Sequence, residues 1–209
     1  IITETGASMN ARAVASACAK LNLSCEVHIG ALDAEKVSLN KDITELYGAD
    51  IKVCHDSTKS LLPAMAAALR SWQSDPTAMY VVGSVCGPHP YPLMVRTFAS
   101  IIGRIAKKQM KDITGKLPST VFAVCGGGSN LSAISYPFYN EKSVDIFGIE
   151  SAGKGIASGA HAATITSKAP IGILLGARSN VLMDADGQVD PSETEASGLD
   201  FSGTGPEIC

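Results

Sequence analysis

Hydrophobic positions along the chain follow two periods in turn, and this alternation predicts helices and strands in repeated order. Stretches in which apolar residues return every three or four positions predict helices over residues 7–22, 33–47, 60–73, about 92–114 and beyond 130. Short apolar runs between them predict strands over residues 25–29, 51–54, 80–82, 121–125 and 144–149. After Glu150 the chain is rich in glycine, so we expect loops there, with one apolar stretch at 171–175.

The order of these elements predicts the class of fold. Strands that alternate with helices favour an α/β fold, in which helices cover a mostly parallel sheet. Asp33 is a candidate N-cap for the helix over 33–47, and Gly48 is a candidate end of that helix. The pattern changes at Gly83, where a proline-rich stretch begins, so we predict two lobes, residues 1–82 and 83–209.

Composition and charge narrow the classes of function. Hydrophobic residues make up 45% of the chain, which excludes intrinsic disorder. The formal net charge of −3 leaves no basic stripe, so we expect no nucleic-acid partner. No apolar run approaches the ~20 residues of a membrane helix, so we expect no membrane partner. The six cysteines show no Cys-x-x-Cys spacing, which predicts buried, reduced thiols in a cytoplasmic protein. Both ends look cut, and we expect an internal segment of a longer protein.

The sharpest local feature is a glycine run between an apolar strand and a helix. It consists of Gly126, Gly127, Gly128, Ser129 and Asn130. Glycines let the backbone approach a ligand, and the amides of a helix N-terminus favour an anion, so this run predicts a phosphate site. A tight strand-to-helix turn with a serine cap is the structural alternative. A dinucleotide site with Glu150 on a ribose is a third possibility, but its third glycine would stand where the chain has Leu131.

A second candidate lies at the start of the chain, where Glu4 leaves a strand and a loop of small residues opens a helix. The loop amides and Thr5 could bind a substrate carboxylate, and Glu4 could transfer protons beside it. The alternative is that Thr5 or Ser8 caps the helix and that Glu4 is solvated.

Four motifs in this order resemble one family. They are residues 4–7 (Glu-Thr-Gly-Ala), 87–92 (Gly-Pro-His-Pro-Tyr-Pro), 125–130 (Cys-Gly-Gly-Gly-Ser-Asn) and 197–200 (Ser-Gly-Leu-Asp). Their spacing is similar to that in tryptophan synthase β chains, and the resemblance covers nearly all of the 209 residues. It corresponds to about the middle half of the family's chain.

The resemblance implies a pyridoxal 5′-phosphate enzyme with the second fold type of this cofactor class, a three-layer fold around a parallel sheet. It implies a lyase of tryptophan biosynthesis that joins indole to L-serine and releases water. It also implies a homodimer in the full-length form, an allosteric partnership with a tryptophan synthase α chain, and a cytoplasmic location, or a plastid in a plant or alga. Residues 1–82 would be the mobile communication lobe, and residues 83–209 part of the cofactor-binding lobe.

The resemblance also assigns roles to residues. Cofactor phosphate would lie on residues 126–130 with Ser84 nearby, Glu4 would be the acid/base group, and Asp200 would pair with Lys36 on closure of the lobe. The loop that holds the substrate carboxylate would consist of Thr5, Gly6, Ala7, Ser8, Met9 and Asn10. Backbone carbonyls of Gly126, Phe201 and Gly203 would bind a monovalent cation, Na⁺ or K⁺.

The chain departs from the family pattern at several positions. The family usually has Gly-Gln-His where this chain has Ser8, Met9 and Asn10, and it usually has arginine where this chain has Lys36. The family's Schiff-base lysine would lie upstream of Ile1, so we expect this segment alone to be inactive. A non-catalytic relative that keeps the fold and a phosphate or partner site is therefore the alternative function.

Overall fold

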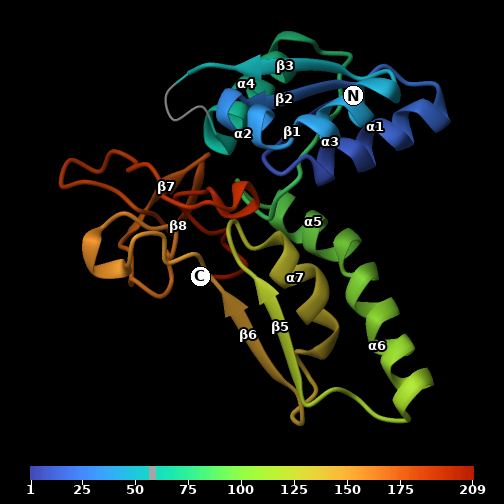
Figure 1. The fold of residues 1–209 in the computed structure, drawn as a ribbon, viewed down its shortest axis with the longest axis vertical. Helices are drawn as coiled ribbons and strands as arrows, with labels where there is room; N and C mark the ends of the chain where they lie inside the picture. The colour runs from blue at the N-terminus through green and yellow to red at the C-terminus, as the bar shows by residue number, and fades with distance from the viewer. Residues whose placement is uncertain (57–59) are drawn as a thin grey trace. The chain divides into compact units, whose positions relative to one another are not determined.

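The computed structural model describes residues 1–56 and 60–209, which form two compact units (Figure 1). The first unit comprises residues 1–83 and 195–201, and the second comprises residues 84–194 and 202–209. The return of residues 195–201 to the first unit was not predicted from the sequence. The lobes of 1–82 and 83–209, with their roles in communication and cofactor binding, stay a prediction.

The first unit is built on four parallel strands, in the order β3-β2-β1-β4. The strands are β1 (Ile2–Thr5), β2 (Glu26–Gly30), β3 (Asp50–Cys54) and β4 (Tyr80–Val81). All four residues of β1 are buried, as expected for a central strand with neighbours on both sides. The parallel sheet predicted from the sequence is therefore confirmed.

Helices cover both faces of this sheet. They are α1 (Met9–Leu21), α2 (Ala31–Lys36), α3 (Ser38–Leu46) and α4 (Leu61–Ser74). The chain runs from β1 outward to β3 and then returns across the sheet to β4, so right-handed crossovers place α1 and α3 on one face and α4 on the other. Val14 and Cys18 of α1 pack against Val27 of β2, which forms the core under the first face.

The helix expected over residues 33–47 is wrong as a single element. The backbone leaves helical geometry at Val37, with φ −118° and ψ 34°, and this residue separates α2 from α3. Asp33 does not cap a helix either, because it lies inside α2, which begins at Ala31, and its side chain is buried. Gly48 does follow the helix end, with a φ of +84° that glycine adopts without strain.

The second unit opens with helices. The continuous helix expected over about 92–114 is two helices, α5 (Tyr91–Ala99) and α6 (Ile101–Thr114). Ser100 stands between them, and its hydroxyl donates a 2.7 Å hydrogen bond to the carbonyl of Thr97. Such a bond back to the preceding turn competes with helical geometry. Apolar periodicity continues across Ser100, so it did not indicate the break.

A parallel pair of strands, β5 (Thr120–Val124) and β6 (Asp145–Ile149), follows with α7 (Ser129–Ser135) between them. Val121, Phe138 and Val144 form the core of this part. On the other face of the strands Phe122 and Phe147 stack on each other at 5.3 Å, and both are exposed. Strand alternation thus buries one face of this pair and leaves the other open.

The segment after Glu150 contains more regular structure than expected. β7 (Ile171–Leu174) and β8 (Ala177–Asn180) form an antiparallel hairpin, so the loop predicted here is wrong at these residues. The hairpin turn consists of Leu175 and Gly176, with φ of +51° and +77°. Leucine rarely adopts such a φ, so the turn carries no ordinary sequence signal. Single turns of 3-10 helix cover Tyr136–Phe138, Ile156–Ser158 and Ser197–Leu199.

Two expectations from composition can be compared with the structure. None of the described helices is both long enough and apolar enough to cross a membrane. All six cysteines are free, but Cys209 is exposed, so the expectation of buried thiols is wrong for that residue. Burial raises the pKa of Cys125 to about 11, which keeps this thiol protonated at neutral pH.

Candidate functional site

The carboxyl end of the first sheet carries the candidate acid/base group. The chain leaves β1 toward β2 on one side and reaches β4 on the other, so the crossovers diverge between β1 and β4. Ligands of open parallel sheets bind where crossovers diverge in this way. Glu4 lies near the end of β1, and Gly83, two residues after the end of β4, contacts the Glu4 carboxylate.

Glu4 is buried, with 1% of its surface exposed, and both of its carboxylate oxygens are hydrogen-bonded. Tyr80 donates its hydroxyl to Oε2 at 2.5 Å, and the amide of Gly83 donates to Oε1 at 2.8 Å. Burial raises the pKa of Glu4 above its ordinary value, while the two hydrogen bonds oppose that rise. Glu4 is therefore not the solvated carboxylate of the alternative interpretation, and its environment is typical of a group that exchanges protons.

The loop after Glu4 leads into α1. Ser8 is buried and adopts the left-handed region, with φ +65°, and it makes no side-chain cap bond to the helix. Among the described residues, none accepts a hydrogen bond from the amides of residues 7–11. These donors at the start of a helix suit a carboxylate. Met9 is 64% exposed, and its role as a substrate ligand stays a prediction.

Asn10, near the start of α1, makes two side-chain hydrogen bonds. Its amide nitrogen donates to the hydroxyl of Thr3 at 2.8 Å and to the carbonyl of Glu4 at 2.9 Å. Thr3 in turn donates to the carbonyl of Val81 at 2.7 Å. The Asn10 side chain thus fixes the end of β1 beside β4, and its role as a substrate ligand stays a prediction.

Asp33 is a buried carboxylate that interacts with both residues of the expected closure pair. Its side chain is fully buried, and neither carboxylate oxygen has a hydrogen-bond partner of normal geometry. Burial raises the pKa of Asp33 to about 6; nearby Ser197 lowers it, Asp200 raises it, and Lys36 lowers it. Lys36 and Asp200 therefore both act on Asp33, while their own pairing on closure stays a prediction.

The glycine run lies in the second unit, where β5 ends and α7 begins. The first helical hydrogen bond of α7 runs from the amide of Ser132 to the carbonyl of Gly128. In the described part of the chain no group accepts a hydrogen bond from the amides of residues 126–131. Asn130 donates its side-chain amide to the carbonyl of Val124 at 3.2 Å, so it braces the run. Unused amides at a glycine-rich helix start suit a phosphate.

Two other segments of the second unit make hydrogen bonds to the glycine run. The amide of Gly205 donates to the carbonyl of Gly127 at 2.9 Å. Cys86 donates its thiol to the same carbonyl at 3.8 Å, and Ser84 contacts that thiol at 3.4 Å. Ser84 is thus in the segment that borders the run, and its role beside the phosphate stays a prediction. Gly128 has a φ of +102°, and a Cβ there would lie 2.5 Å from Ile208, so close packing requires glycine at this position.

Comparison with known proteins shows the family. The family model for pyridoxal-phosphate dependent enzymes matches residues 1–195. The chain belongs to the pyridoxal-phosphate dependent enzymes.

Individual curated proteins show to which enzymes of this family the chain is similar. The tryptophan synthase β chain of Methylobacterium nodulans is 42% identical over 208 residues, which are 99% of this chain and 51% of the relative. The β chain of Methylobacterium radiotolerans is 43% identical over 208 residues, covering 99% of this chain and 50% of the relative. The chain is thus a homologue of tryptophan synthase β chains and spans about half the length of the curated relatives it matches.

Solved structures agree on the fold. Holo diaminopropionate ammonia lyase from Escherichia coli matches with a TM-score of 0.67 at 16% identity, over 98% of this chain and 45% of the lyase. A pyridoxal 5′-phosphate-dependent aspartate racemase matches with a TM-score of 0.58 at 17% identity, over 95% of this chain and 50% of the racemase. The chain has the second fold type of pyridoxal-phosphate enzymes, as the resemblance implied.

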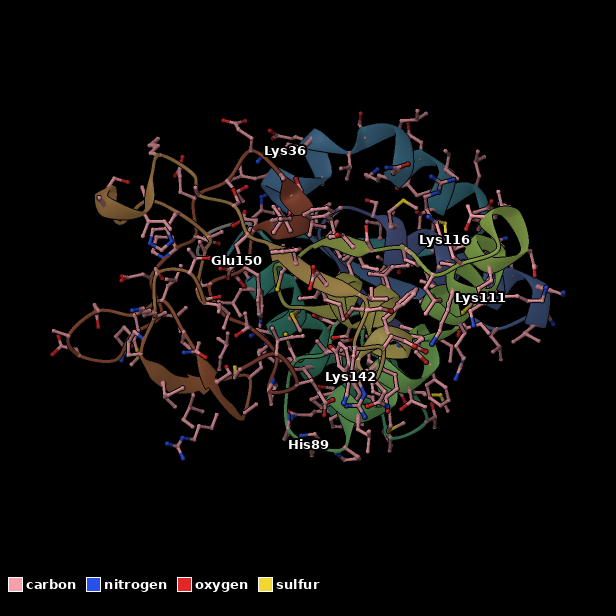
Figure 2. All side chains as sticks on the ribbon, turned by 90° about the horizontal axis from the view of Figure 1, so that it is seen from below. Lys36, His89, Lys111, Lys116, Lys142 and Glu150 are labelled. Atoms are coloured by element: carbon pink, nitrogen blue, oxygen red, sulfur yellow. The ribbon has the colours of Figure 1, made fainter. Side chains whose placement is uncertain are left out.

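The dinucleotide interpretation of the glycine run is wrong. Glu150, labelled in Figure 2, follows β6 and uses its carboxylate within the chain. Oε1 accepts from the amide of Ile165 at 2.9 Å, and Oε2 accepts from the amide and the hydroxyl of Thr166 at 2.8 and 2.6 Å. A carboxylate with these partners holds a turn and is not available for a ribose.

The cation site that the resemblance implies would consist of backbone carbonyls. No cluster of three or more histidine, cysteine or acidic residues lies among the described residues. The carbonyl site expected at Gly126, Phe201 and Gly203 is of another kind, and it stays a prediction. Gly203 forms an antiparallel bridge with Val181, which fixes its backbone.

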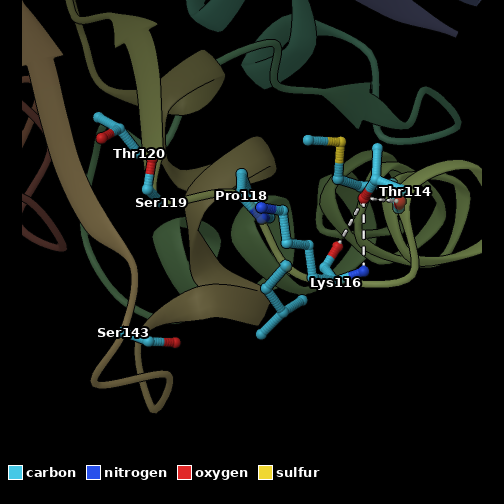
Figure 3. Close-up of a pocket in the computed structure, with 8 residues that line it drawn as sticks. Thr114, Lys116, Pro118, Ser119, Thr120 and Ser143 are labelled. Atoms are coloured by element: carbon cyan, nitrogen blue, oxygen red, sulfur yellow. Dashed lines mark hydrogen bonds between the residues drawn. The ribbon is translucent and has the colours of Figure 1, made fainter.

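A depression of about 660 Å³ lies near the amino end of β5 (Figure 3). Its rim includes Thr114 and Lys116. The Thr114 hydroxyl donates a 3.0 Å hydrogen bond to the backbone carbonyl of Lys116. The glycine run lies at the opposite, carboxyl end of β5, where ligands of parallel sheets bind. The depression is therefore not the cofactor site.

Sequence reasoning missed three residues that hydrogen-bond to the two candidate groups, one in each unit. Tyr80 and Gly83 bind Glu4, and Gly205 binds the glycine run. Gly205 carried one signal, because it stands beside Pro206 in a glycine-rich stretch. Tyr80 carried none, because a tyrosine in a strand is ordinary.

Proposed function

We propose that the protein to which this segment belongs forms L-tryptophan from L-serine and indole with pyridoxal phosphate. The observation that carries the proposal is the buried carboxylate of Glu4, held at both oxygens near the end of β1. The similarity to β chains over 99% of this chain supports the same substrates. A homodimer, a tryptophan synthase α partner, allosteric control and a cytoplasmic or plastid location belong to this proposal, on the resemblance alone.

The residues of the glycine run fit the cofactor's phosphate. Their unused amides supply donors, and Gly128 holds a φ of +102° that glycine adopts without strain. Ser129 and Ser84 would add hydroxyl donors. When bound, pyridoxal phosphate supplies the electron-withdrawing ring that allows serine to lose its hydroxyl group. The resemblance assigns the lysine that holds this ring to a part of the family chain outside these residues.

The chain's own groups would then handle the substrate and its protons. The amides of residues 7–11 would bind the serine carboxylate. Protonated Glu4 would give its proton to the departing hydroxyl, which leaves as water, and the carboxylate could then accept a proton from indole. Asp200 and Lys36 would pair when the lobe closes, and such an exposed pair contributes only about 0–1 kcal/mol.

A non-catalytic relative is the second candidate, and one observation favours it. This chain has Asn10 where the family usually has a histidine in the loop, and the Asn10 side chain is turned toward Thr3 and Glu4. The test is an assay of the full-length protein to which this segment belongs, with L-serine, indole and added pyridoxal phosphate, and with tryptophan measured by chromatography. Tryptophan formation supports the proposal. Cofactor binding without tryptophan formation supports the non-catalytic relative.

A further inference from the structure

We propose that Tyr80 is a positioning residue for Glu4, and that together with Gly83 it fixes Oε2 as the oxygen that carries the exchangeable proton. The inference rests on the proposed function, in which Glu4 transfers protons. It concerns the first unit alone, because Glu4, Tyr80 and Gly83 all lie there.

The strand register brings the two side chains to one face of the sheet. Ile2 of β1 is level with Tyr80 of β4, and Glu4 lies two positions after Ile2 in the same strand. Residues two apart on a strand point to the same face. Glu4 and Tyr80 therefore both lie on the face that α4 covers, where the hydroxyl reaches Oε2 at 2.5 Å. This distance is typical of a hydrogen bond to a charged oxygen.

The two partners of Glu4 differ in what they can do. The amide of Gly83 can only donate, so Oε1 always acts as an acceptor. The Tyr80 hydroxyl can donate to the carboxylate, and it can also accept a proton from the carboxylic acid. When Glu4 is protonated, this arrangement therefore favours the proton on Oε2, where Tyr80 can accept it. Tyr80 can stabilise both protonation states without movement of the carboxylate.

Packing fixes the orientation of the tyrosine. Trp72 of α4 stacks on the Tyr80 ring, with 5.8 Å between ring centres and 27° between planes. The indole nitrogen of Trp72 donates to the carbonyl of Ala78 at 3.2 Å, just before β4. The indole thus anchors α4 to the chain that precedes Tyr80, and the hydroxyl is aimed at Oε2 by the stacked rings.

Other charged groups on this face have partners of their own. His28 of β2 is level with Glu4 in the register, and its Nε2 contacts Glu26 at 2.7 Å. Ser71 of α4 donates to the same oxygen of Glu26 at 2.5 Å. Beyond them on the strands, Lys52 of β3 contacts Asp50 at 2.7 Å. The groups that act on the protonation of Glu4 besides burial are Tyr80, Gly83 and the backbone of Glu4 itself.

The test replaces only the hydroxyl. Tyr80→Phe keeps the ring that stacks on Trp72, so the unit should still fold, and Tyr47→Phe is the control because Tyr47 is 41% exposed on the same unit. The full-length protein to which this segment belongs is loaded with pyridoxal phosphate and labelled with ¹³C at the glutamate carboxyl groups. The Glu4 signal is assigned by its absence in Glu4→Gln. The signal is then titrated, and the pH dependence of kcat/KM is measured in parallel.

We expect Tyr80→Phe to raise the pKa of Glu4, because it removes a donor to the carboxylate. The limb of the pH profile that matches Glu4 should move to higher pH by the same amount. The value of kcat should fall about tenfold or more, with a smaller change in the KM for serine. Tyr47→Phe should change none of these quantities.

An unchanged pKa of Glu4 in Tyr80→Phe overturns the inference, and so does a loss of activity without a shift of the pH profile, because that loss would be structural. Failure of the proposed function looks different. If Glu4→Gln keeps full activity, Glu4 is not the acid/base group. The positioning role then falls with it, whatever the titration of Glu4 gives.

Discussion

The amide of Gly205 donates a 2.9 Å hydrogen bond to the carbonyl of Gly127, in the middle of the glycine run. Gly205 also packs so closely on Val85 that a Cβ at this position would overlap the Val85 carbonyl oxygen. Three segments that are far apart in the sequence therefore meet at one point of the second unit. The shape of the candidate phosphate site depends on all three.

This contact predicts the effect of Gly205→Ala. The added methyl group must push the Val85 backbone away, which should lower the free energy of unfolding by about 1–3 kcal/mol. It should also weaken phosphate binding, because Gly127 moves with its partner. Calorimetry and a titration with pyridoxal phosphate measure the two effects. Gly198→Ala is the control, since its φ is not in the left-handed region and its added Cβ would meet only the Ala7 side chain, at an ordinary contact distance of 3.4 Å. Equal losses in both variants would contradict the account.

The left-handed backbone at Ser8 leads us to expect that glycine at this position stabilises the folded chain. It holds φ +65°, which costs a residue with a Cβ about 1–2 kcal/mol, whereas glycine adopts this region freely. Ser8→Gly should therefore raise the free energy of unfolding by about 0.5–1 kcal/mol, after the greater entropy of glycine in the unfolded chain is subtracted. Ser8→Ala keeps the Cβ and the strain and should give no gain. Urea unfolding compares the three proteins, and a gain in Ser8→Ala would refute the strain.

Asp33 predicts a pH dependence of stability. Its pKa is about 6 in the folded chain, against an ordinary value of 3.8. An acid whose pKa is raised by folding contributes stability below its ordinary pKa, and it loses that contribution as the pH rises through the folded pKa. Between pH 4 and pH 7 the unit should therefore lose at most about 3 kcal/mol through this group.

Asp33→Asn removes the titration and keeps the shape. The stability of this variant relative to the unchanged protein should rise between pH 4 and pH 7. Fluorescence of Trp72, the single tryptophan, reports urea unfolding of the first unit, in which it lies. A difference between the two proteins that is constant with pH would mean that Asp33 is not buried as the structure has it.

The lysines of this segment predict a negative labelling result. None of them stands in the sequence context of the family's cofactor lysine, so reduction with borohydride in the presence of pyridoxal phosphate should leave no lysine labelled in full. Peptide mapping by mass spectrometry measures the label. One lysine with stoichiometric label would show that this segment carries the covalent site.

Much of the fold was predictable because local patterns decide it. Apolar runs such as residues 121–125 form strands wherever helices can cover them, and the parallel sheet follows from their order. The breaks at Val37 and Ser100 were not predictable, because apolar periodicity continues across both. The hairpin over 171–180 was missed because its turn places Leu175 at a positive φ.

The candidate site residues were likewise only partly predictable from the sequence. Glu4 and the glycine run are continuous in the sequence, so composition and position were enough to select them. Tyr80 lies 76 residues from Glu4, and only the strand order, with β4 beside β1, brings them together. Local pattern does not contain that order. The same applies to Asp33, which the pattern marked as a helix cap and the structure buries near Ser197.

Glu4→Gln in the full-length protein to which this segment belongs tests the central claim most directly. Glutamine has the same shape and can accept from Gly83, but it carries no exchangeable acid proton. We expect tryptophan formation from L-serine and indole to fall by at least about 100-fold, while the absorption spectrum of bound pyridoxal phosphate stays unchanged, since the glycine run is untouched. Activity equal to that of the unchanged protein would contradict the role of Glu4 and, with it, the proposed chemistry.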